Sequence, residues 1–211
     1  LAERDNDPEA QRQVRELTST LIPEEACFIR NAVLHMDQMI QGILRYSRAG
    51  RIQPEIQPLN LRDVIQDALQ TLSYLIRETT AEIQVDPNIP PCLGDRSMLN
   101  QVLINVLENA IKYKSPQRTL HINIYGHTEN DWTIVCIEDN GIGIDELHIE
   151  KIFDLFYRAH EHNDIPGDGL GLALSSRLMT RMNGRIWAES TRDIGSRFFL
   201  ALPRLKSERK S

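Results

Sequence analysis

The sequence is poor in cysteine, and its few cysteines form no pairing or ligand pattern. Three occur in 211 residues, at Cys27, Cys92 and Cys136. An odd number at wide spacing fits neither a disulfide framework nor a zinc motif, whose ligands come in close pairs. We therefore interpret all three as small buried side chains in a reduced, cytoplasmic setting.

Long apolar runs and blocks of positive charge are also absent. No stretch approaches the roughly 18 apolar residues of a membrane helix, and the first residues do not resemble a signal peptide. The net charge is −6, and Lys and Arg are not clustered as phosphate contacts to nucleic acid require. We expect no membrane insertion in this segment and no nucleic-acid partner. The sequence does not begin with Met, which is compatible with its being a fragment of a longer protein that is anchored in a membrane.

Residues 1–50 show the pattern of a helical hairpin. Apolar residues recur at helical spacing as far as Leu21, and Ile22-Pro23 ends that helix. In the second helix the apolar residues step by 4, 3, 4 and 3, at Ile29, Val33, Met36, Ile40 and Ile43. This is the a/d seam of a coiled coil, so we predict a homodimer in which two hairpins form a four-helix bundle. Packing of the seam against the second domain is the alternative.

A proline-containing segment, residues 51–59, is interpreted as a linker to a second domain at 60–205, which is followed by a tail at 206–211. In this domain we predict helices after Asn60 and over 97–114 and 171–182, and strands over 81–85, 120–125, 132–138, 185–189 and 197–202. Helices mixed with hairpin strands indicate an α/β sandwich, in which helices cover one face of a mixed sheet. The whole chain is thus assigned to the α+β class.

The helix predicted over 97–114 carries an unexpected polar pair. Asn105 and Asn109 are four residues apart and therefore project from one face, and Lys112 and Tyr113 follow on the next turn. Asparagine is a middling helix former, so two of them on an otherwise apolar helix suggest a ligand. Carboxamide oxygens suit Mg²⁺, and Lys112 can neutralise phosphate charge. A solvated helix face is the alternative.

The strand predicted before residue 139 ends in a glycine-rich segment, Asp139-Asn140-Gly141-Ile142-Gly143. Its two glycines allow positive φ and close approach of the backbone to a ligand. Asp139 could accept a hydrogen bond from an exocyclic amine. Taken alone, the segment is more often a plain turn, and the other ligand positions of a calcium loop are missing.

A second glycine-rich segment, residues 167–171, opens directly into a helix. Its free N–H groups and the positive end of the helix dipole favour an anion. The spacing matches neither the Walker A loop nor the dinucleotide fingerprint. Between the two glycine segments, Phe153 and Phe156 precede a polar stretch. These phenylalanines could anchor a lid over a nucleotide. The alternative, to which we give equal weight, is an ordinary surface loop that is attached to the protein by these two apolar side chains.

In this order the segments resemble the boxes of the GHKL ATPase superfamily, and within it the sensor histidine kinases of two-component systems. Residues 105–113 resemble the N box, 139–143 the G1 box, 153–158 the F box, 167–171 the G2 box and 195–199 the final glycine motif. The resemblance covers residues 60–205. Residues 24–50 resemble the second helix of the family's dimerisation and histidine-phosphotransfer hairpin.

The resemblance implies a Bergerat-type domain that binds ATP and Mg²⁺. The resemblance implies that twelve residues bind ATP, namely Asn105, Asn109, Lys112, Tyr113, Asp139, Gly141, Gly143, Arg158, Gly167, Gly169, Leu170 and Gly171. By the same resemblance, Asn109 would bind Mg²⁺ with Asn105 assisting. Lys112 and Arg158 would face the phosphates, and Asp139 would hydrogen-bond the adenine amine.

One position separates the histidine kinases from ATP-hydrolysing relatives of the superfamily. Those relatives place a Glu base four residues before the metal-binding asparagine, where this chain has Asn105, and Glu108 points elsewhere on the helix. The resemblance therefore implies a protein-histidine kinase that preserves ATP for transfer to a histidine of its own dimer, and onward to the receiver domain of a response regulator. A catalytically degenerate ATP-binding scaffold and a GHKL-type ATPase are the alternatives.

The acceptor histidine of that family is not identified in this sequence. Its usual place falls near or before residue 1, so either the hairpin starts earlier or the motif has degenerated. His35 is the only histidine in residues 1–50 and lies off the apolar seam, so we interpret it as a surface residue. His160 and His162 fall in the predicted lid and are interpreted as part of a solvated loop.

Overall fold

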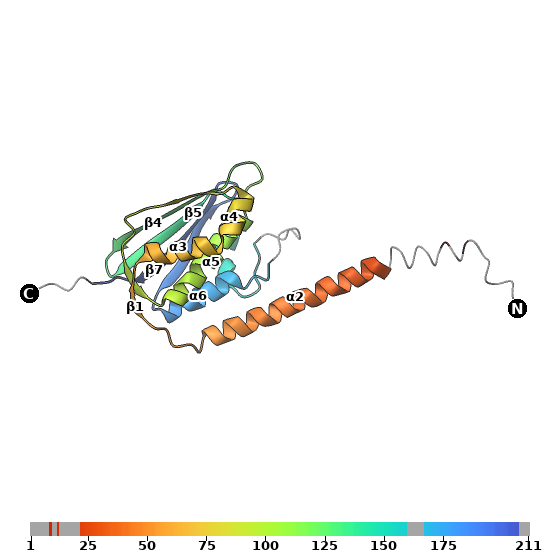
Figure 1. The fold of residues 1–211 in the computed structure, drawn as a ribbon, viewed down its shortest axis with the longest axis horizontal. Coiled ribbons are helices and arrows are strands. Elements are labelled where there is room, and N and C mark those ends of the chain that lie inside the picture. The colour runs from red at the N-terminus through yellow and green to blue at the C-terminus, as the bar shows by residue number, and fades with distance from the viewer. Residues whose placement is uncertain (1–8, 10–11, 13–21, 160–166, 207–211) are drawn as a thin grey trace, which may run out of the picture. The chain divides into compact units, whose positions relative to one another are not determined.

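The computed structural model describes residues 9, 12, 22–159 and 167–206 (Figure 1). The chain divides into two compact units, Leu1–Ile43 and Leu44–Ser211, which are described separately. Most of the first predicted hairpin helix lies outside the described residues, as do His160 and His162 and most of the predicted tail. No helix in the described part of the chain is both long enough and apolar enough to cross a membrane.

The second predicted hairpin helix is confirmed as α2, which spans Ile22–Ala49. Its apolar stripe is exposed in the single chain, with relative exposures between 41% and 72%. The stripe consists of Phe28, Ile29, Val33, Leu34, Met36, Ile40, Ile43 and Leu44. So many exposed apolar side chains along one helix are typical of a protein–protein contact.

The second unit contains a mixed five-stranded sheet with the strand order β2-β4-β5-β7-β6. The strands are β2 (Glu82–Val85), β4 (His121–Glu129), β5 (Trp132–Asp139), β6 (Arg185–Thr191) and β7 (Gly195–Pro203). The pairing of β2 with β4 is parallel and the other pairings are antiparallel. In this register Asp139, the last residue of β5, lies opposite Ser196 near the start of β7. The predicted strands are thereby confirmed.

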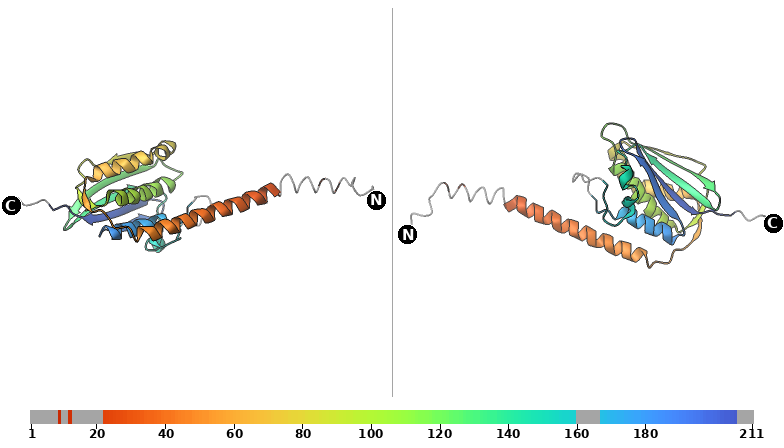
Figure 2. Two further views of the ribbon diagram at one scale, coloured as in Figure 1. Left: turned by 60° about the horizontal axis from the view of Figure 1, so that its bottom comes forward. Right: turned by 180° about the vertical axis from the view of Figure 1, so that it is seen from behind.

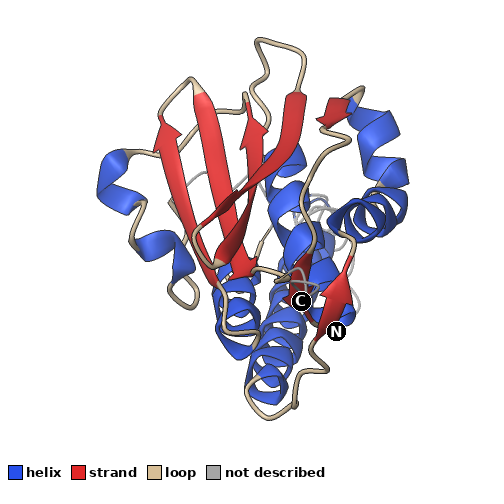
Figure 3. Cartoon of the chain, turned by 90° about the vertical axis from the view of Figure 1, so that its left-hand side faces the viewer, coloured by secondary structure: helices blue, strands red, loops and turns tan. Residues whose placement is uncertain are grey.

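Helices α3 (Leu61–Thr71), α5 (Arg96–Lys112) and α6 (Gly171–Arg181) pack side by side over one face of this sheet (Figures 1 and 2). Figure 3 shows the strands and the main helices as adjacent layers. The apolar side of α5 is almost fully buried at Leu99, Val102, Leu103, Val106 and Leu107. Each such side chain contributes roughly 1.5–3 kcal/mol of hydrophobic stabilisation. The expected α/β sandwich is therefore present.

Side-chain caps fix where two of these helices begin. The Asn60 side chain accepts a hydrogen bond from the backbone N–H of Arg62 at 3.1 Å, as the sequence predicts for a cap. Asp95 caps α5 through bonds from the N–H groups of Ser97 and Met98. These caps set the helical phase of α5, and therefore the direction in which its two site asparagines project.

Three short elements differ from the sequence expectation. Strands β1 (Gln57–Leu59) and β3 (Cys92–Gly94) form a separate two-stranded antiparallel sheet, and helix α4 spans Ser73–Thr79. Because Leu59 is buried in the core, the end of the segment interpreted as a linker packs on the second unit. Three-residue strands are too short to show an alternating pattern, and Pro58 argued against a strand.

The expected burial of the cysteines is confirmed for two of the three. Cys92 and Cys136 are buried, and burial raises the pKa of the Cys92 thiol to about 12. Such thiols are inert because the reactive thiolate does not form at neutral pH. The interpretation is wrong for Cys27, which is exposed on α2. A single small residue does not reveal which face of a helix it occupies.

Candidate functional site

The first site asparagine, Asn105, joins helices α5 and α6. Its amide nitrogen donates to the backbone oxygen of Gly171 at 3.0 Å and to Ser175 Oγ at 3.1 Å. Its amide oxygen accepts from Gln101 Nε2 at 3.0 Å. Both ends of this carboxamide are therefore engaged within the chain. The consequence is that the end of the G2 segment, where α6 begins, is held at a fixed place beside the N box.

The second site asparagine, Asn109, lies one turn later on α5 and is half-buried. Its backbone oxygen accepts from the N–H of Tyr113 at 2.9 Å, which continues the helix. Within the described residues, no hydrogen bond engages its side chain. A carboxamide offers an acceptor oxygen and two N–H donors, so Asn109 has its full capacity left for a ligand.

Lys112 brings a positive charge from α5 to the G2 segment. A Cβ atom placed on Gly167 would lie 2.5 Å from its ammonium nitrogen. Burial lowers the pKa of Lys112, and the positive charge of Arg158 lowers it further, whereas Glu108 and Asp168 raise it. The effect of Arg158 on Lys112 indicates that two positively charged side chains lie near each other beside the G2 segment.

Asp139 is a buried carboxyl group at the end of β5. Burial raises its pKa to about 6, and hydrogen bonds from the N–H groups of Gly141 and Ser196 oppose that increase. The bond from Gly141 measures 2.8 Å. At neutral pH the group is therefore mainly ionised, yet it is poorly solvated. It is a strong acceptor for any N–H donor that enters beside it.

The G1 segment is fastened to the end of α5. The N–H of Ile142 donates to the backbone oxygen of Tyr113 at 3.0 Å, directly after Lys112. Gly143 has φ +67°, and a Cβ there would lie 2.0 Å from the backbone oxygen of Thr191. Only glycine fits both the conformation and the space at that position.

Gly143→Ala is therefore expected to destabilise the second unit by about 2 kcal/mol or more, since alanine there combines a left-handed backbone with a steric clash. Gly171→Ala is the matched control, because its Cβ would meet nothing closer than Asn105 Cγ at 3.9 Å. Thermal unfolding of both variants gives the comparison. Equal stability of the two would contradict the close approach of Gly143 to Thr191.

The F and G2 segments meet through their backbones. The N–H of Phe156 donates to the oxygen of Gly169 at 3.1 Å, and the N–H of Leu170 donates to Asp168 Oδ1 at 3.0 Å. Helix α6 then begins at Gly171, and no side chain in the described ranges caps it. Unlike α3 and α5, α6 thus keeps first-turn N–H groups for another acceptor, such as a phosphate oxygen.

Contacts among the described residues therefore connect four of the five segments singled out from the sequence, namely the N, G1, F and G2 boxes. The N box touches G1 at Tyr113 and G2 at Lys112 and Asn105, and G2 touches the F box at Phe156. The part that each residue plays toward ATP stays a prediction. Two polar residues of this assembly were missed, Ser175 and Arg118, because neither belongs to a recognisable motif.

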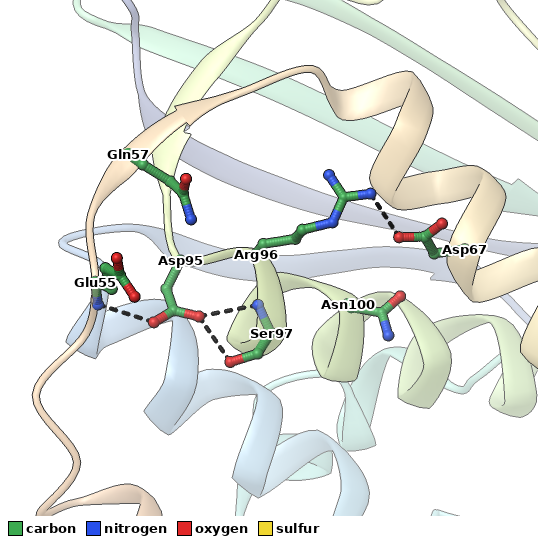
Figure 4. Close-up of a pocket in the computed structure, with 7 residues that line it drawn as sticks. All are labelled: Glu55, Gln57, Asp67, Asp95, Arg96, Ser97 and Asn100. Carbon is green, nitrogen blue, oxygen red and sulfur yellow. Dashed lines mark hydrogen bonds and ion pairs between the residues drawn. The ribbon is translucent and has the colours of Figure 1, made fainter.

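A separate cavity of about 350 Å³ lies at the N-terminal end of α5 (Figure 4). The residues that line it are Glu55, Gln57, Asp67, Asp95, Arg96, Ser97 and Asn100. Some of its polar groups bond one another, as in the 2.6 Å ion pair between Arg96 and Asp67. The side-chain oxygen of Asn100 is buried and has no hydrogen-bond partner among the described residues. None of the residues predicted to bind ATP lines this cavity.

Comparison with known proteins gives consistent matches. The family model described as histidine kinase-, DNA gyrase B-, and HSP90-like ATPase matches residues 94–206. The phytochrome-like protein Cph1 of Synechocystis sp. is 34% identical over 179 residues, which are 83% of this chain and 23% of Cph1. The methanogenesis regulatory histidine kinase FilI of Methanothrix harundinacea is 31% identical over 85% of this chain and 20% of its own length.

The fold also matches solved structures. The structure of histidine kinase ThkA in complex with response regulator protein TrrA aligns with a TM-score of 0.64 and 23% identity, covering 97% of this chain and 54% of that chain. The chain spans less than a quarter of the length of Cph1 and of FilI. The match therefore covers only a part of those proteins.

Proposed function

Since the chain belongs to the sensor histidine kinases, within the family of histidine kinase-, DNA gyrase B- and HSP90-like ATPases, we propose that it is the ATP-dependent protein-histidine kinase core of a two-component signalling receptor. In this proposal the γ-phosphate of ATP passes to a histidine of the dimer and then to the receiver domain of a response regulator. The acceptor histidine is not identified among its residues.

The observation that carries the proposal is the position four residues before Asn109. Asn105 occupies it, and its amide is bound to Gly171 and Ser175. An amide cannot take a proton from water, so this position supplies no general base for hydrolysis. Glu108 is exposed and acts on Lys112 electrostatically. ATP held here is protected from water attack and kept for transfer.

The residues also fit Mg²⁺, which prefers oxygen ligands. The two asparagines differ in what they have left for a ligand. The carboxamide of Asn105 is hydrogen-bonded at both ends, whereas that of Asn109 forms no hydrogen bond to other described residues. We assign the metal contact mainly to Asn109, while Asn105 assists only if its bond from Gln101 opens. When bound, Mg²⁺ neutralises charge on the phosphate oxygens. Lys112 and Arg158 add positive charge on the same side, and Asp139 orients the adenine.

The exposed stripe of α2 supports a homodimer. Its apolar side chains follow the spacing of a helical bundle, and a second copy of the chain offers the same surface in return. The response regulator is the proposed second partner, as in the ThkA complex with TrrA. Because both ATP and this partner belong to the cell interior, we also propose a cytoplasmic location for this segment.

Incubation with γ-labelled ATP tests the proposal. The chain is mixed with a separate polypeptide that carries a complete family hairpin with its acceptor histidine, and label is expected on that hairpin. Label on neither polypeptide would contradict kinase activity and favour a binding scaffold. Steady release of phosphate that is lost in Glu108→Gln would instead indicate an ATPase. A hairpin whose histidine is replaced by alanine is the control.

A further inference from the structure

Arg118 holds four backbone oxygens from two segments that are far apart in the sequence. It lies in the loop between α5 and β4. Its Nε donates to the oxygen of Asn140 at 2.6 Å, and its Nη2 to that of Gly141 at 2.7 Å. Nη2 also donates to the oxygens of Asp193 at 2.7 Å and Ile194 at 3.1 Å. One guanidinium thus joins the G1 segment to the turn between β6 and β7.

Within the G1 segment, the Gly141 N–H also donates to the Asp139 carboxylate at 2.8 Å, which is a charge-assisted bond. Three of the further bonds that fasten this region are made by neutral groups. They run from the Asp193 N–H to the Ile142 oxygen at 2.7 Å, from the Ile144 N–H to Ser190 Oγ at 2.7 Å, and from Asn140 Nδ2 to the Thr119 oxygen at 2.9 Å. Charge-assisted bonds are about twice as strong as neutral ones. Arg118 therefore supplies charge-assisted bonds that run from the G1 segment to the turn between β6 and β7.

We propose that Arg118 is a positioning residue of the nucleotide site. It fixes the backbone immediately after Asp139, so that the Asp139 carboxylate faces the amine of the bound base. The inference rests on the proposed function, because it takes the base to be the adenine of ATP. Only a guanidinium presents donors in a rigid planar fork, so a lysine cannot hold the same set of oxygens.

Arg118 also acts on Asp139 through its charge. The groups that set the ionisation of Asp139 are its buried surroundings, the N–H groups of Gly141 and Ser196, the negative Glu138 and the positive Arg118. Arg118 is the only positive group in that set. Its removal raises the pKa of Asp139 further, so the carboxyl group gains a proton nearer to neutral pH. A protonated carboxyl is a poorer acceptor for an amine.

Two replacements separate the effect of the planar guanidinium donors of Arg118 from the effect of its positive charge. Arg118→Lys keeps the charge and loses the fork, whereas Arg118→Met loses both. The matched control is Arg192→Met, on the same turn, because the Arg192 side chain is 73% exposed and its ion pair in the described part of the chain is with its neighbour Asp193, at 3.9 Å. Mg-ATP affinity is measured calorimetrically from about pH 5 to about pH 8, a range that brackets the titration of Asp139.

In Arg118→Met we expect ATP affinity to fall about tenfold at neutral pH and the midpoint of the pH profile to move upward. In Arg118→Lys we expect affinity to fall several-fold with an unchanged midpoint, and Arg192→Met should match the wild type. Wild-type affinity and midpoint in Arg118→Met would overturn the inference. Reduced affinity with an unmoved midpoint in that variant would also overturn it, since a purely structural role predicts that result.

Two measurements on the nucleotide-free chain keep this inference separate from the proposed function. Amide exchange at Ile142 and Asp193 should become faster in both Arg118 variants, and NMR titration of Asp139 should show its pKa rising in Arg118→Met alone. If the wild type binds no ATP, the proposed function fails, but these two measurements still test whether Arg118 holds the backbone after Asp139. If Arg118→Met does not fold, unchanged exchange in Arg118→Lys overturns the inference.

Discussion

Asp139→Asn is expected to lose most of its affinity for ATP and yet to be more stable than the wild type without nucleotide at neutral pH. Asp139 is 8% exposed, and burial raises the pKa of its carboxyl group from 3.8 to about 6. One pKa unit corresponds to about 1.4 kcal/mol, so keeping this group ionised in the folded state costs up to about 3 kcal/mol. Asparagine removes the charge and keeps an oxygen for the N–H of Gly141.

The pH dependence gives this prediction its sign. A carboxyl whose pKa is raised by folding stabilises the folded state below its unfolded pKa, and that stabilisation is lost as pH rises through the folded pKa. The advantage of Asp139→Asn should thus be full above about pH 6 and vanish below about pH 4, where the wild-type group is protonated in both states. Thermal unfolding at several pH values measures it.

Calorimetry with Mg-ATP measures the other half of the prediction. Asn presents either an oxygen or an N–H group toward the base, and the charge that attracts the adenine amine is gone, so affinity falls by roughly tenfold or more. Asp131→Asn is the control, on an exposed turn of the same sheet, and should change neither quantity. Lower stability of Asp139→Asn at neutral pH would show that the buried charge is compensated in the wild type.

The fold could be predicted largely because its main elements carry strong local signals. Most apolar residues of α5 recur every three or four positions, and all of them except the partly buried Ile104 are buried. Asn60 caps α3 as its residue type suggests. The short elements carry no such signals. Helix α4 follows α3 after a single residue, Leu72, and buries none of its own side chains. Its position depends on contacts with distant parts of the chain, which a local pattern does not contain.

The site could also be predicted only in part. The chemistry of single residues pointed to some of its members, whereas the tertiary contacts between them could not be derived from the sequence. Asp139 and Asn109 could be selected because a carboxylate and a carboxamide suit an amine and a metal ion. The partners of Asn105 could not be predicted, since Gly171 and Ser175 lie 66 and 70 residues further along the chain. Arg118 was missed for the same reason, because its oxygen acceptors come together only when the sheet has formed.

Asn109→Ala is expected to remove the Mg²⁺-dependent part of ATP affinity, weakening binding by roughly a hundredfold, or about 2.7 kcal/mol. Its folding stability should change little, because its carboxamide forms no hydrogen bond to other described residues and alanine favours helices. Asn105→Ala is expected to behave differently. It removes bonds to Gly171 and Ser175, so stability should fall by about 1–2 kcal/mol together with ATP affinity.

Titration with ATP in the presence of Mg²⁺, and again with a chelator, separates these effects. Asn109→Ala should differ from the wild type only when Mg²⁺ is present, whereas a positioning defect in Asn105→Ala should persist without it. Asn100→Ala is the matched control, since Asn100 lies on the same helix and lines the separate cavity of Figure 4. Unchanged affinity in both Asn109→Ala and Asp139→Asn would show that ATP binds elsewhere. A loss in Asn109→Ala that persists in chelator would assign that residue to the nucleotide itself, and the metal contact would then fall to Asn105.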